Sequence, residues 1–177
     1  MFRISQYMRE LAHAEQTGHY PEVRERKARG PVVIWNLIRR CNLTCKHCYA
    51  LSADHDYVGE LTLPEVFTVM DDLKGFGVPA LILSGGEPLL RPDIFDISAQ
   101  ARKLGFYTGL STNGTLIDRP LAQRIAQEGF DYVGISLDGL KPTHDKFRRL
   151  DGAFDRSLAA MRFLAEFGVK VGLRFTM

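Results

Sequence analysis

All three cysteines of the 177-residue chain lie in one short stretch with the spacing C-x3-C-x2-C. They are Cys41, Cys45 and Cys48. A disulfide would use two of them and leave the third unpaired, and so short a loop gains little stability from closure. Cysteine is usually placed for its reactivity and not for its packing. The stretch therefore predicts a metal centre held by three thiolates.

Two kinds of metal centre fit three clustered thiolates. Zinc would take His47 or His55 as its fourth ligand, but structural zinc sites usually use two ligand pairs that are well separated in the chain, and no second pair is present here. A ferredoxin-type cluster would need four cysteines. Three thiolates can hold a [4Fe–4S] cluster with one iron open to a small molecule, which is the favoured interpretation. We interpret His13, His19 and His55 as structural or solvated residues.

Composition places the chain among ordinary globular proteins. Hydrophobic residues make up 45%, charged residues 25%, and the net charge is +2. A charge this small predicts no nucleic-acid or membrane partner. No apolar run approaches the ~18 residues of a membrane span, and the first residues show no export signal. Clustered thiols without a disulfide framework predict the reducing cytoplasm.

Apolar and polar segments alternate along the chain in the pattern of strands and helices. The apolar, β-branched run at residues 32–38 predicts a strand buried on both faces, and it leads directly into the cysteine loop. Further strands are predicted at 80–83, 106–110, 132–135 and 169–175, with helices that begin near Thr62, Ile94, Asp118 and Phe154. Such alternation implies parallel strands with right-handed crossovers, and hence an α/β fold.

The chain divides into two predicted parts. Residues 1–30 are expected to form a short helix over about 5–16 and a charged linker at 21–30. Residues 31–177 are expected to form one α/β domain. A strand predicted so close to Met177 would lack a covering helix. We therefore expect the N-terminal portion of a larger enzyme, cut after about the fifth strand.

The predicted strands end in small polar loops. The first is Ser84-Gly85-Gly86-Glu87-Pro88, the next contains Ser111 and Asn113, and the one after it contains Ser136 and Asp138. Carboxyl ends of parallel strands meet at one edge, where such folds keep their active sites. Glycines let a backbone approach a ligand, and a glutamate suits a cationic amino group. A simple βα turn remains the alternative for Gly85–Glu87, and an Asn-Gly turn for Asn113.

Two arginines are candidates to bind a carboxylate. Arg148 follows the fourth predicted strand in the stretch His-Asp-Lys-Phe-Arg, and Arg174 lies in the fifth. A guanidinium matches a carboxylate through two parallel hydrogen bonds. A surface salt bridge is the alternative for either residue.

The motif C-x3-C-x2-C with His47 before the last cysteine, followed by Gly-Gly-Glu-Pro, resembles the radical S-adenosylmethionine (SAM) superfamily. The resemblance implies a partial parallel (β/α) barrel of six units, of which this chain would hold about five strands. It implies a [4Fe–4S] cluster on Cys41, Cys45 and Cys48, whose open iron binds the amino and carboxylate groups of SAM. It also implies that SAM lies against Gly85, Gly86, Glu87, Ser111, Asn113, Ser136, Asp138 and Arg148.

Residues 2–11 and 31–36 resemble the haem d1 biosynthesis branch of this family. That branch implies reductive cleavage of SAM to a 5′-deoxyadenosyl radical, which acts on propionate side chains of a siroheme-derived tetrapyrrole. A one-electron donor such as flavodoxin or ferredoxin is implied as a partner, and a cysteine-rich C-terminal extension is expected to be absent from this chain. A radical SAM peptide-modifying enzyme shares the Ser-Leu-Asp-Gly stretch and stays an alternative. A zinc-binding interaction module is the alternative of another class.

Overall fold

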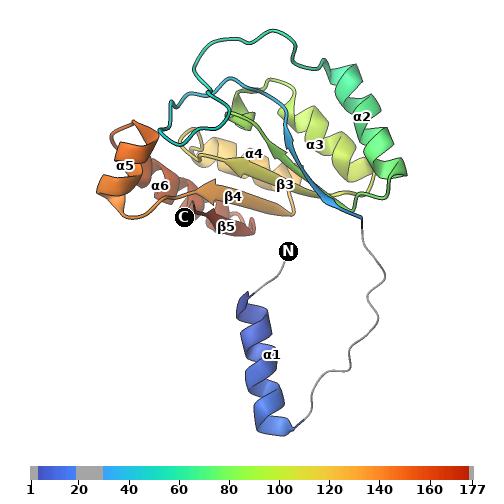
Figure 1. Cartoon of the computed structure of the whole chain (residues 1–177), viewed down its shortest axis with the longest axis vertical. Helices are drawn as coiled ribbons and strands as arrows, with labels where there is room; N and C mark the ends of the chain where they lie inside the picture. Colours follow the sequence, from blue (N-terminus) through green and yellow to red (C-terminus); the bar gives the residue numbers. More distant parts are fainter. Residues whose placement is uncertain (1–3, 19–29, 176–177) are drawn as a thin grey trace.

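A computed structural model describes residues 4–18 and 30–175 of the chain. The helix α1 (Ile4–Thr17) confirms the helix predicted near the N-terminus, and it is drawn apart from the sheet in Figure 1. His19 and nearly all of the predicted charged linker at 21–30 lie outside the described residues.

The domain is built on one sheet of five parallel strands in the order β1-β2-β3-β4-β5. Each strand pairs with the next one along the chain, as expected when every crossover has the same hand. This arrangement confirms the predicted parallel α/β fold of the partial-barrel type. The strands are β1 (Val32–Asn36), β2 (Ala80–Ser84), β3 (Tyr107–Thr112), β4 (Tyr132–Ser136) and β5 (Val171–Arg174).

Helices between the strands cover one face of the sheet (Figure 1). Their ends carry the signals read from the sequence: Thr62 and Glu65 form a capping box at α2, and the Asp118 carboxylate accepts the Leu121 N–H at α4. Gly129, with φ 70°, ends α4 in the left-handed conformation. The helices are α2 (Leu63–Gly75), α3 (Ile94–Lys103), α4 (Arg119–Glu128), α5 (Lys141–Arg148) and α6 (Ala153–Glu166), with a short 3-10 turn η1 (Pro88–Leu90).

The hydrophobic core lies between the sheet and these helices. Alternate strand residues point into it, and those of the three inner strands are fully buried. The helices contribute Val66, Met70, Ile97, Ile125 and Leu164, and the sheet contributes Leu81, Leu83, Leu110, Val133 and Ile135. The opposite face of the sheet is therefore left to line a cavity.

The prediction that the first strand is buried on both faces was wrong. Val32 and Ile34 are 53% and 56% exposed, while Val33 and Trp35 pack against the core. The helices cover only one face, and β1 is an edge strand, so its alternate residues stay open. The strand also ends at Asn36, two residues before the predicted end, because Leu37 begins the approach to the cysteine loop.

The helix α5 was not predicted. Its sequence KPTHDKFR is polar and too short for an apolar stripe to show, and it contains a proline in its first turn. Its end is unusual, because Arg149 takes the left-handed conformation with φ 54° without being glycine. The helix nevertheless buries His144 and Arg148, which are polar.

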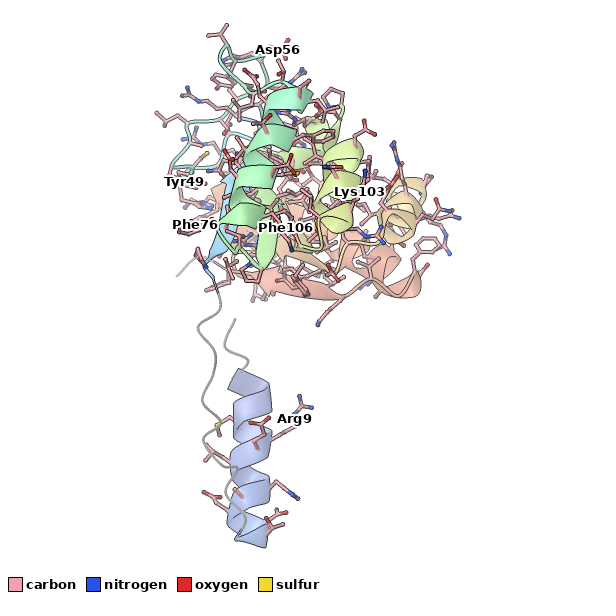
Figure 2. All side chains as sticks on the ribbon, turned by 90° about the vertical axis from the view of Figure 1, so that its right-hand side faces the viewer. Arg9, Tyr49, Asp56, Phe76, Lys103 and Phe106 are labelled. Atoms are coloured by element: carbon pink, nitrogen blue, oxygen red, sulfur yellow. The ribbon has the colours of Figure 1, made fainter. Side chains whose placement is uncertain are left out.

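The long connection between β1 and α2 covers the carboxyl end of the sheet. Figure 2 shows Tyr49 and Asp56 on this connection, whereas Phe76 lies at the other end of α2.

No helix among the described residues is long and apolar enough to cross a membrane.

Candidate functional site

One cavity of about 500 Å³ brings most of the predicted site residues together, but Glu87 and Asp138 do not line it. All three cysteines line it, although burial and hydrogen-bonding differ among them. The strand ends supply the rest of its wall, as parallel sheets require. The lining predicted from sequence consists of Cys41, Cys45, His47, Cys48, Gly85, Gly86, Ser111, Asn113, Ser136, Arg148 and Arg174.

Cys41 is the most buried of the three thiols, with 6% of its surface exposed. Burial raises the pKa of this thiol to about 11, although the N–H of Leu43 donates to its sulfur at 3.4 Å and lowers the pKa in part. The side-chain amide of Asn113 also approaches the Cys41 sulfur, at 3.9 Å. Two N–H donors thus face a sulfur that would carry negative charge as a metal ligand.

Cys45 and Cys48 lie at more open positions. For Cys48, burial raises the pKa, but N–H groups of Ser52 and its neighbours outweigh that effect, and the net pKa is lowered. The Cys45 sulfur receives an N–H from the Arg148 guanidinium at 3.6 Å. Among residues 4–18 and 30–175, no group of three His, Cys, Asp or Glu side chains is arranged to hold a single metal ion.

Gly85 and Gly86 hold the backbone that leads to Cys41. A Cβ at Gly85 would lie 2.4 Å from the Ile38 oxygen, and one at Gly86 would lie 2.4 Å from the oxygens of Arg39 and Arg40. The Gly86 N–H donates to the Ile38 oxygen at 2.6 Å. The glycines were expected to admit a ligand. They line the cavity, and because they have no side chain they also let the backbone of residues 38–40, which leads to the cysteine loop, pack closely against them.

Glu87 is fully buried, and it is not among the residues that line the cavity. Its carboxylate accepts the Thr112 hydroxyl at 2.7 Å, the Asn113 N–H at 2.9 Å and the Leu89 N–H at 3.2 Å. Burial raises the pKa of Glu87 to about 7 despite these hydrogen bonds. The carboxylate therefore fastens the loop after β2 to the loop after β3.

The side chain of Asn113 bridges the β3 loop and the cysteine loop. Its amide nitrogen donates to the Asn42 side chain at 3.0 Å, and Asn42 donates to the Thr115 hydroxyl at 2.9 Å. Asn42 and Thr115 were not singled out from the sequence, although Asn42 stands directly after Cys41. Ser111, by contrast, lines the cavity from β3 itself.

A buried ion pair joins the loop after β4 to α5, and both of its members approach the cysteine loop. Asp138 and Arg148 are 4% and 8% exposed, and their charged groups are 2.5 Å apart. The His47 ring nitrogen Nε2 lies 3.8 Å from the same Asp138 oxygen. Arg148 thus already has two partners, Asp138 and Cys45.

Arg174, the other candidate for a carboxylate, enters the cavity from β5. It forms no side-chain hydrogen bond or ion pair with the described part of the chain. Ser136, at the end of β4, pairs with Arg174 in the sheet register, and both line the cavity. A hydroxyl and a guanidinium therefore remain open at this edge.

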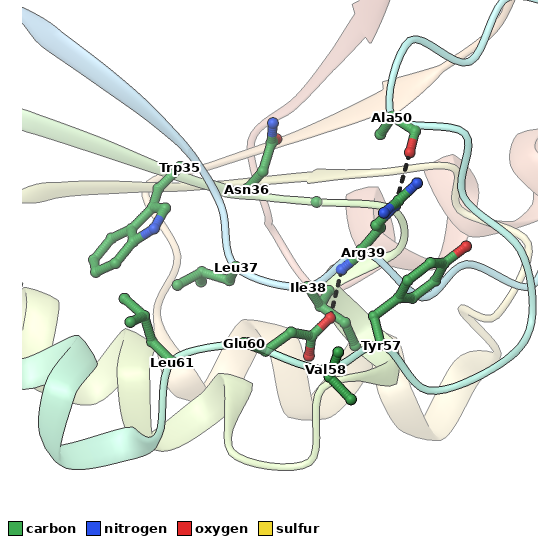
Figure 3. A pocket seen from close by; sticks show the side chains of 12 residues that line it. Trp35, Asn36, Leu37, Ile38, Arg39, Ala50, Tyr57, Val58, Glu60 and Leu61 are labelled. Carbon is green, nitrogen blue, oxygen red and sulfur yellow. Dashed lines mark hydrogen bonds between the residues drawn. The ribbon is translucent and has the colours of Figure 1, made fainter.

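A second cavity, of about 430 Å³, lies beside the cysteine loop and is lined by none of the three cysteines (Figure 3). Arg39 crosses it: the Arg39 N–H donates to Glu60 at 2.7 Å, and its guanidinium donates to the Ala50 oxygen at 3.0 Å. The same guanidinium lies 4.4 Å from the Tyr57 ring centre. These contacts join the start of the connection between β1 and α2 to its later residues.

The sequence comparison decides the family of this site. Residues 35–177 match the model of the radical SAM superfamily. The chain belongs to the radical SAM superfamily. The cofactors of this family are a [4Fe–4S] cluster and SAM. The cavity fits them, because three thiols line it together with the polar side chains of Ser136 and Arg174 at the ends of β4 and β5.

Two curated relatives are named for tetrapyrrole chemistry. The chain is 52% identical over its full length to "Pre-heme d1 synthase" of Dinoroseobacter shibae, of which it covers 43%. It is 49% identical over 85% of its length to "Fe-coproporphyrin III synthase" of Methanosarcina barkeri, of which it covers 38%. The chain thus spans less than half the length of these relatives.

A solved radical SAM structure has the same fold. "Native anSMEcpe with bound AdoMet and Cp18Cys peptide" superposes with a TM-score of 0.64 at 26% identity, over 80% of this chain and 41% of that one. The likeness supports the partial-barrel fold.

Proposed function

We propose that Cys41, Cys45 and Cys48 ligate one [4Fe–4S] cluster at the carboxyl end of the sheet. The observation that carries this proposal is that all three thiols line one cavity together with the strand-end loops. When bound and reduced, the cluster supplies the electron that cleaves SAM to a 5′-deoxyadenosyl radical. The chain contributes the thiolates, the N–H donors beside their sulfurs and a partly closed cavity.

We further propose that SAM occupies the open side of this cavity. The backbone of Gly85 and Gly86 would hold its amino end, and Ser111 and Ser136 would bind its polar groups from the strand ends. Glu87, Asn113 and Asp138 would act through the loops that they fasten, because each of them is buried and hydrogen-bonded within the protein.

The substrate that we propose is a siroheme-derived tetrapyrrole, modified at its propionate side chains. The similarity to a pre-heme d1 synthase at 52% identity supports this class. Arg174 would bind a carboxylate, either of SAM or of a propionate, because its guanidinium faces the cavity without a partner among the described residues. A flavodoxin or ferredoxin would donate the electron.

The first experiment tests the cluster. Anaerobic reconstitution of the full-length protein should give about four iron and four sulfide per chain. Each of Cys41→Ala, Cys45→Ala and Cys48→Ala should lose the cluster, and SAM should change the electron paramagnetic resonance spectrum of the reduced wild type. Stoichiometric zinc without sulfide would reject the proposal and favour a zinc-binding module.

The second experiment distinguishes a tetrapyrrole substrate from a peptide substrate. The peptide stays the alternative because the solved relative has a bound peptide. The full-length enzyme is incubated with reductant, SAM and didecarboxysiroheme deuterated on the propionate methylenes. Transfer of deuterium into 5′-deoxyadenosine, with loss of propionate mass, supports the tetrapyrrole. Deuterium that stays on the macrocycle while a cysteine-containing peptide is modified supports the peptide.

A further inference from the structure

The guanidinium of Arg148 faces the sulfur of the middle cysteine of the motif. Its Nη1 lies 3.6 Å from the Cys45 sulfur, across a separation of 103 residues in sequence. Arg148 comes from the last turn of α5 and is 8% exposed, so little water competes for this contact. An arginine is always protonated, and it therefore brings a permanent positive charge to a sulfur that would be a thiolate.

Asp138 fixes the orientation of this guanidinium. The Asp138 carboxylate accepts Nη2 of Arg148 at 2.5 Å, which leaves Nη1 directed toward Cys45. The backbone N–H of Asp138 donates to Nδ1 of His144, which is itself buried in α5. Because Asp138 contacts α5 at two residues, the ion pair cannot rotate away from Cys45 unless the helix moves.

The helix α5 is in turn attached to the cysteine loop and to α6. The Lys46 N–H, next to Cys45, donates to the Phe147 oxygen at 2.8 Å. At the other side, the Asp145 carboxylate accepts the N–H groups of Gly152 and Phe154 at 2.9 and 2.8 Å. The rings of His47 and Phe147 lie 5.4 Å apart. A charged hydrogen bond, a backbone hydrogen bond and a ring contact thus converge on three consecutive residues of the loop, Cys45, Lys46 and His47.

We infer that Arg148 is a positioning residue for Cys45 that also raises the reduction potential of the cluster. The inference rests on the proposed function, since it needs Cys45 to be a cluster ligand. Reduction adds one negative charge to the cluster, and an N–H donor on a ligand sulfur stabilises the reduced state more than the oxidised one. The side chain that approaches Cys41 is the neutral amide of Asn113, so of these two cysteines only Cys45 has a positively charged donor at its sulfur.

This role differs from the one that the sequence suggested for Arg148, which was to bind the carboxylate of SAM. Nη1 and Nη2 already contact Cys45 and Asp138, and the buried Nε has no hydrogen-bond partner among the described residues. The carboxylate of SAM is thereby left to Arg174.

The test compares two neighbouring arginines in the full-length, anaerobically reconstituted protein. Arg148→Gln replaces the charged guanidinium donor with a shorter, neutral amide, and Arg149→Gln removes the same charge from the adjacent exposed position. The readouts are iron and sulfide content and the midpoint potential from a redox titration followed by electron paramagnetic resonance. At a fixed potential, Arg148→Gln should lower the ratio of reduced to oxidised cluster about tenfold, a shift of about 59 mV to more negative values. Arg149→Gln should leave it unchanged.

Arg148→Lys keeps the charge and loses the planar fork, so its potential should fall between those of the wild type and Arg148→Gln. A fully loaded Arg148→Gln protein with the wild-type potential would overturn the inference. If Arg148→Gln does not retain a cluster, Arg148→Lys decides, because a wild-type potential in that variant would also overturn it. Absence of a cluster from the wild type would reject the proposed function itself.

Discussion

At the scale of single residues, the glycines after β2 act on the cysteine loop. Gly86 packs against two backbone oxygens, those of Arg39 and Arg40, and neither can swing aside as a side-chain end could. Gly86 therefore has no room for a side chain, whereas the sequence indicated only that a ligand could approach its backbone.

We expect Gly86→Ala to lower the free energy of unfolding by about 1–3 kcal/mol and to reduce cluster content, because the added Cβ displaces the backbone before Cys41. Gly75→Ala is the matched control, since nothing lies within 4 Å of its Cβ at the end of α2. Chemical denaturation and iron content measure both effects. Equal stability of the two variants would contradict the packing argument.

Glu87 predicts a dependence of stability on pH. Its pKa is about 7 in the folded chain against an ordinary 4.5, so its contribution is fully present below pH 4.5 and is lost as pH rises through about 7. The free energy of unfolding of the wild type should therefore fall between pH 5.5 and 8.5, by up to about 1.4 kcal/mol per pH unit. Its melting temperature should fall over the same range. Glu87→Gln should weaken that dependence.

Glu65→Gln supplies the control for Glu87→Gln. Hydrogen bonds from Thr62 lower the pKa of the exposed Glu65, so its contribution is lost only as pH falls toward the acid range. A Glu65→Gln protein should keep the wild-type decline between pH 5.5 and 8.5. Identical curves for Glu87→Gln and the wild type would show that Glu87 does not titrate in this range.

The sequence predicted which residues meet, but not through which atoms. Spacing after each strand was enough to place Cys41, Gly85, Asn113 and Arg148 at one edge of the sheet. It could not show that Asn113 and Arg148 turn toward sulfur atoms, because side-chain direction depends on contacts over 72 and 103 residues. Burial of Glu87 likewise depends on the loop after β3, which no local pattern reveals.

At the scale of elements, strands and covering helices were predictable and α5 was not. An amphipathic stripe marks α2, α4 and α6, because each packs one side on the sheet. The helix α5 instead closes the β4–α6 connection with polar contacts, so it has no stripe to detect. The exposed face of β1 was missed for a related reason: apolar residues on an inner sheet face resemble a strand buried on both sides.

The attachment of α5 to α6 can be tested at Asp145. Asp145→Ala removes the acceptor for two N–H groups at the start of α6 and should lower the free energy of unfolding by about 1–2 kcal/mol. Because α5 carries Arg148, cluster content should fall as well. Asp151→Ala, at an exposed position in the same connection, should change neither quantity in denaturation and iron assays. If Asp145→Ala lowers stability but keeps the wild-type cluster content, the position of α5 does not matter for the cluster.

At the scale of the whole molecule, the proposed cluster site joins the two ends of the described sheet. The cysteine loop follows β1, whereas Arg148 and Arg174 come from beyond β4 and from β5. A ligand bound at such a place stabilises the folded state by mass action.

We expect removal of the cluster by anaerobic chelation to lower the unfolding free energy of the full-length protein by at least about 3 kcal/mol, the effect of a ligand at 100 times its dissociation constant. Differential scanning calorimetry before and after chelation measures the change in Tm. A variant with Cys41, Cys45 and Cys48 all replaced by Ala should melt at the same temperature with or without chelator. A wild type whose Tm does not move would argue against a cluster that links the sheet.

The separation of 103 residues from Cys45 to Arg148 also sets an order of events during synthesis. At about 5–20 residues per second, a ribosome needs about 5–20 s to make that interval. During that time the three thiols have been synthesised but the arginine and the completed sheet have not, whereas the Asn113 amide is made earlier in the interval. Cluster delivery before this point would meet an unformed cavity, and oxidants would meet unprotected thiols. Loading after release of the chain is the timing that the architecture favours.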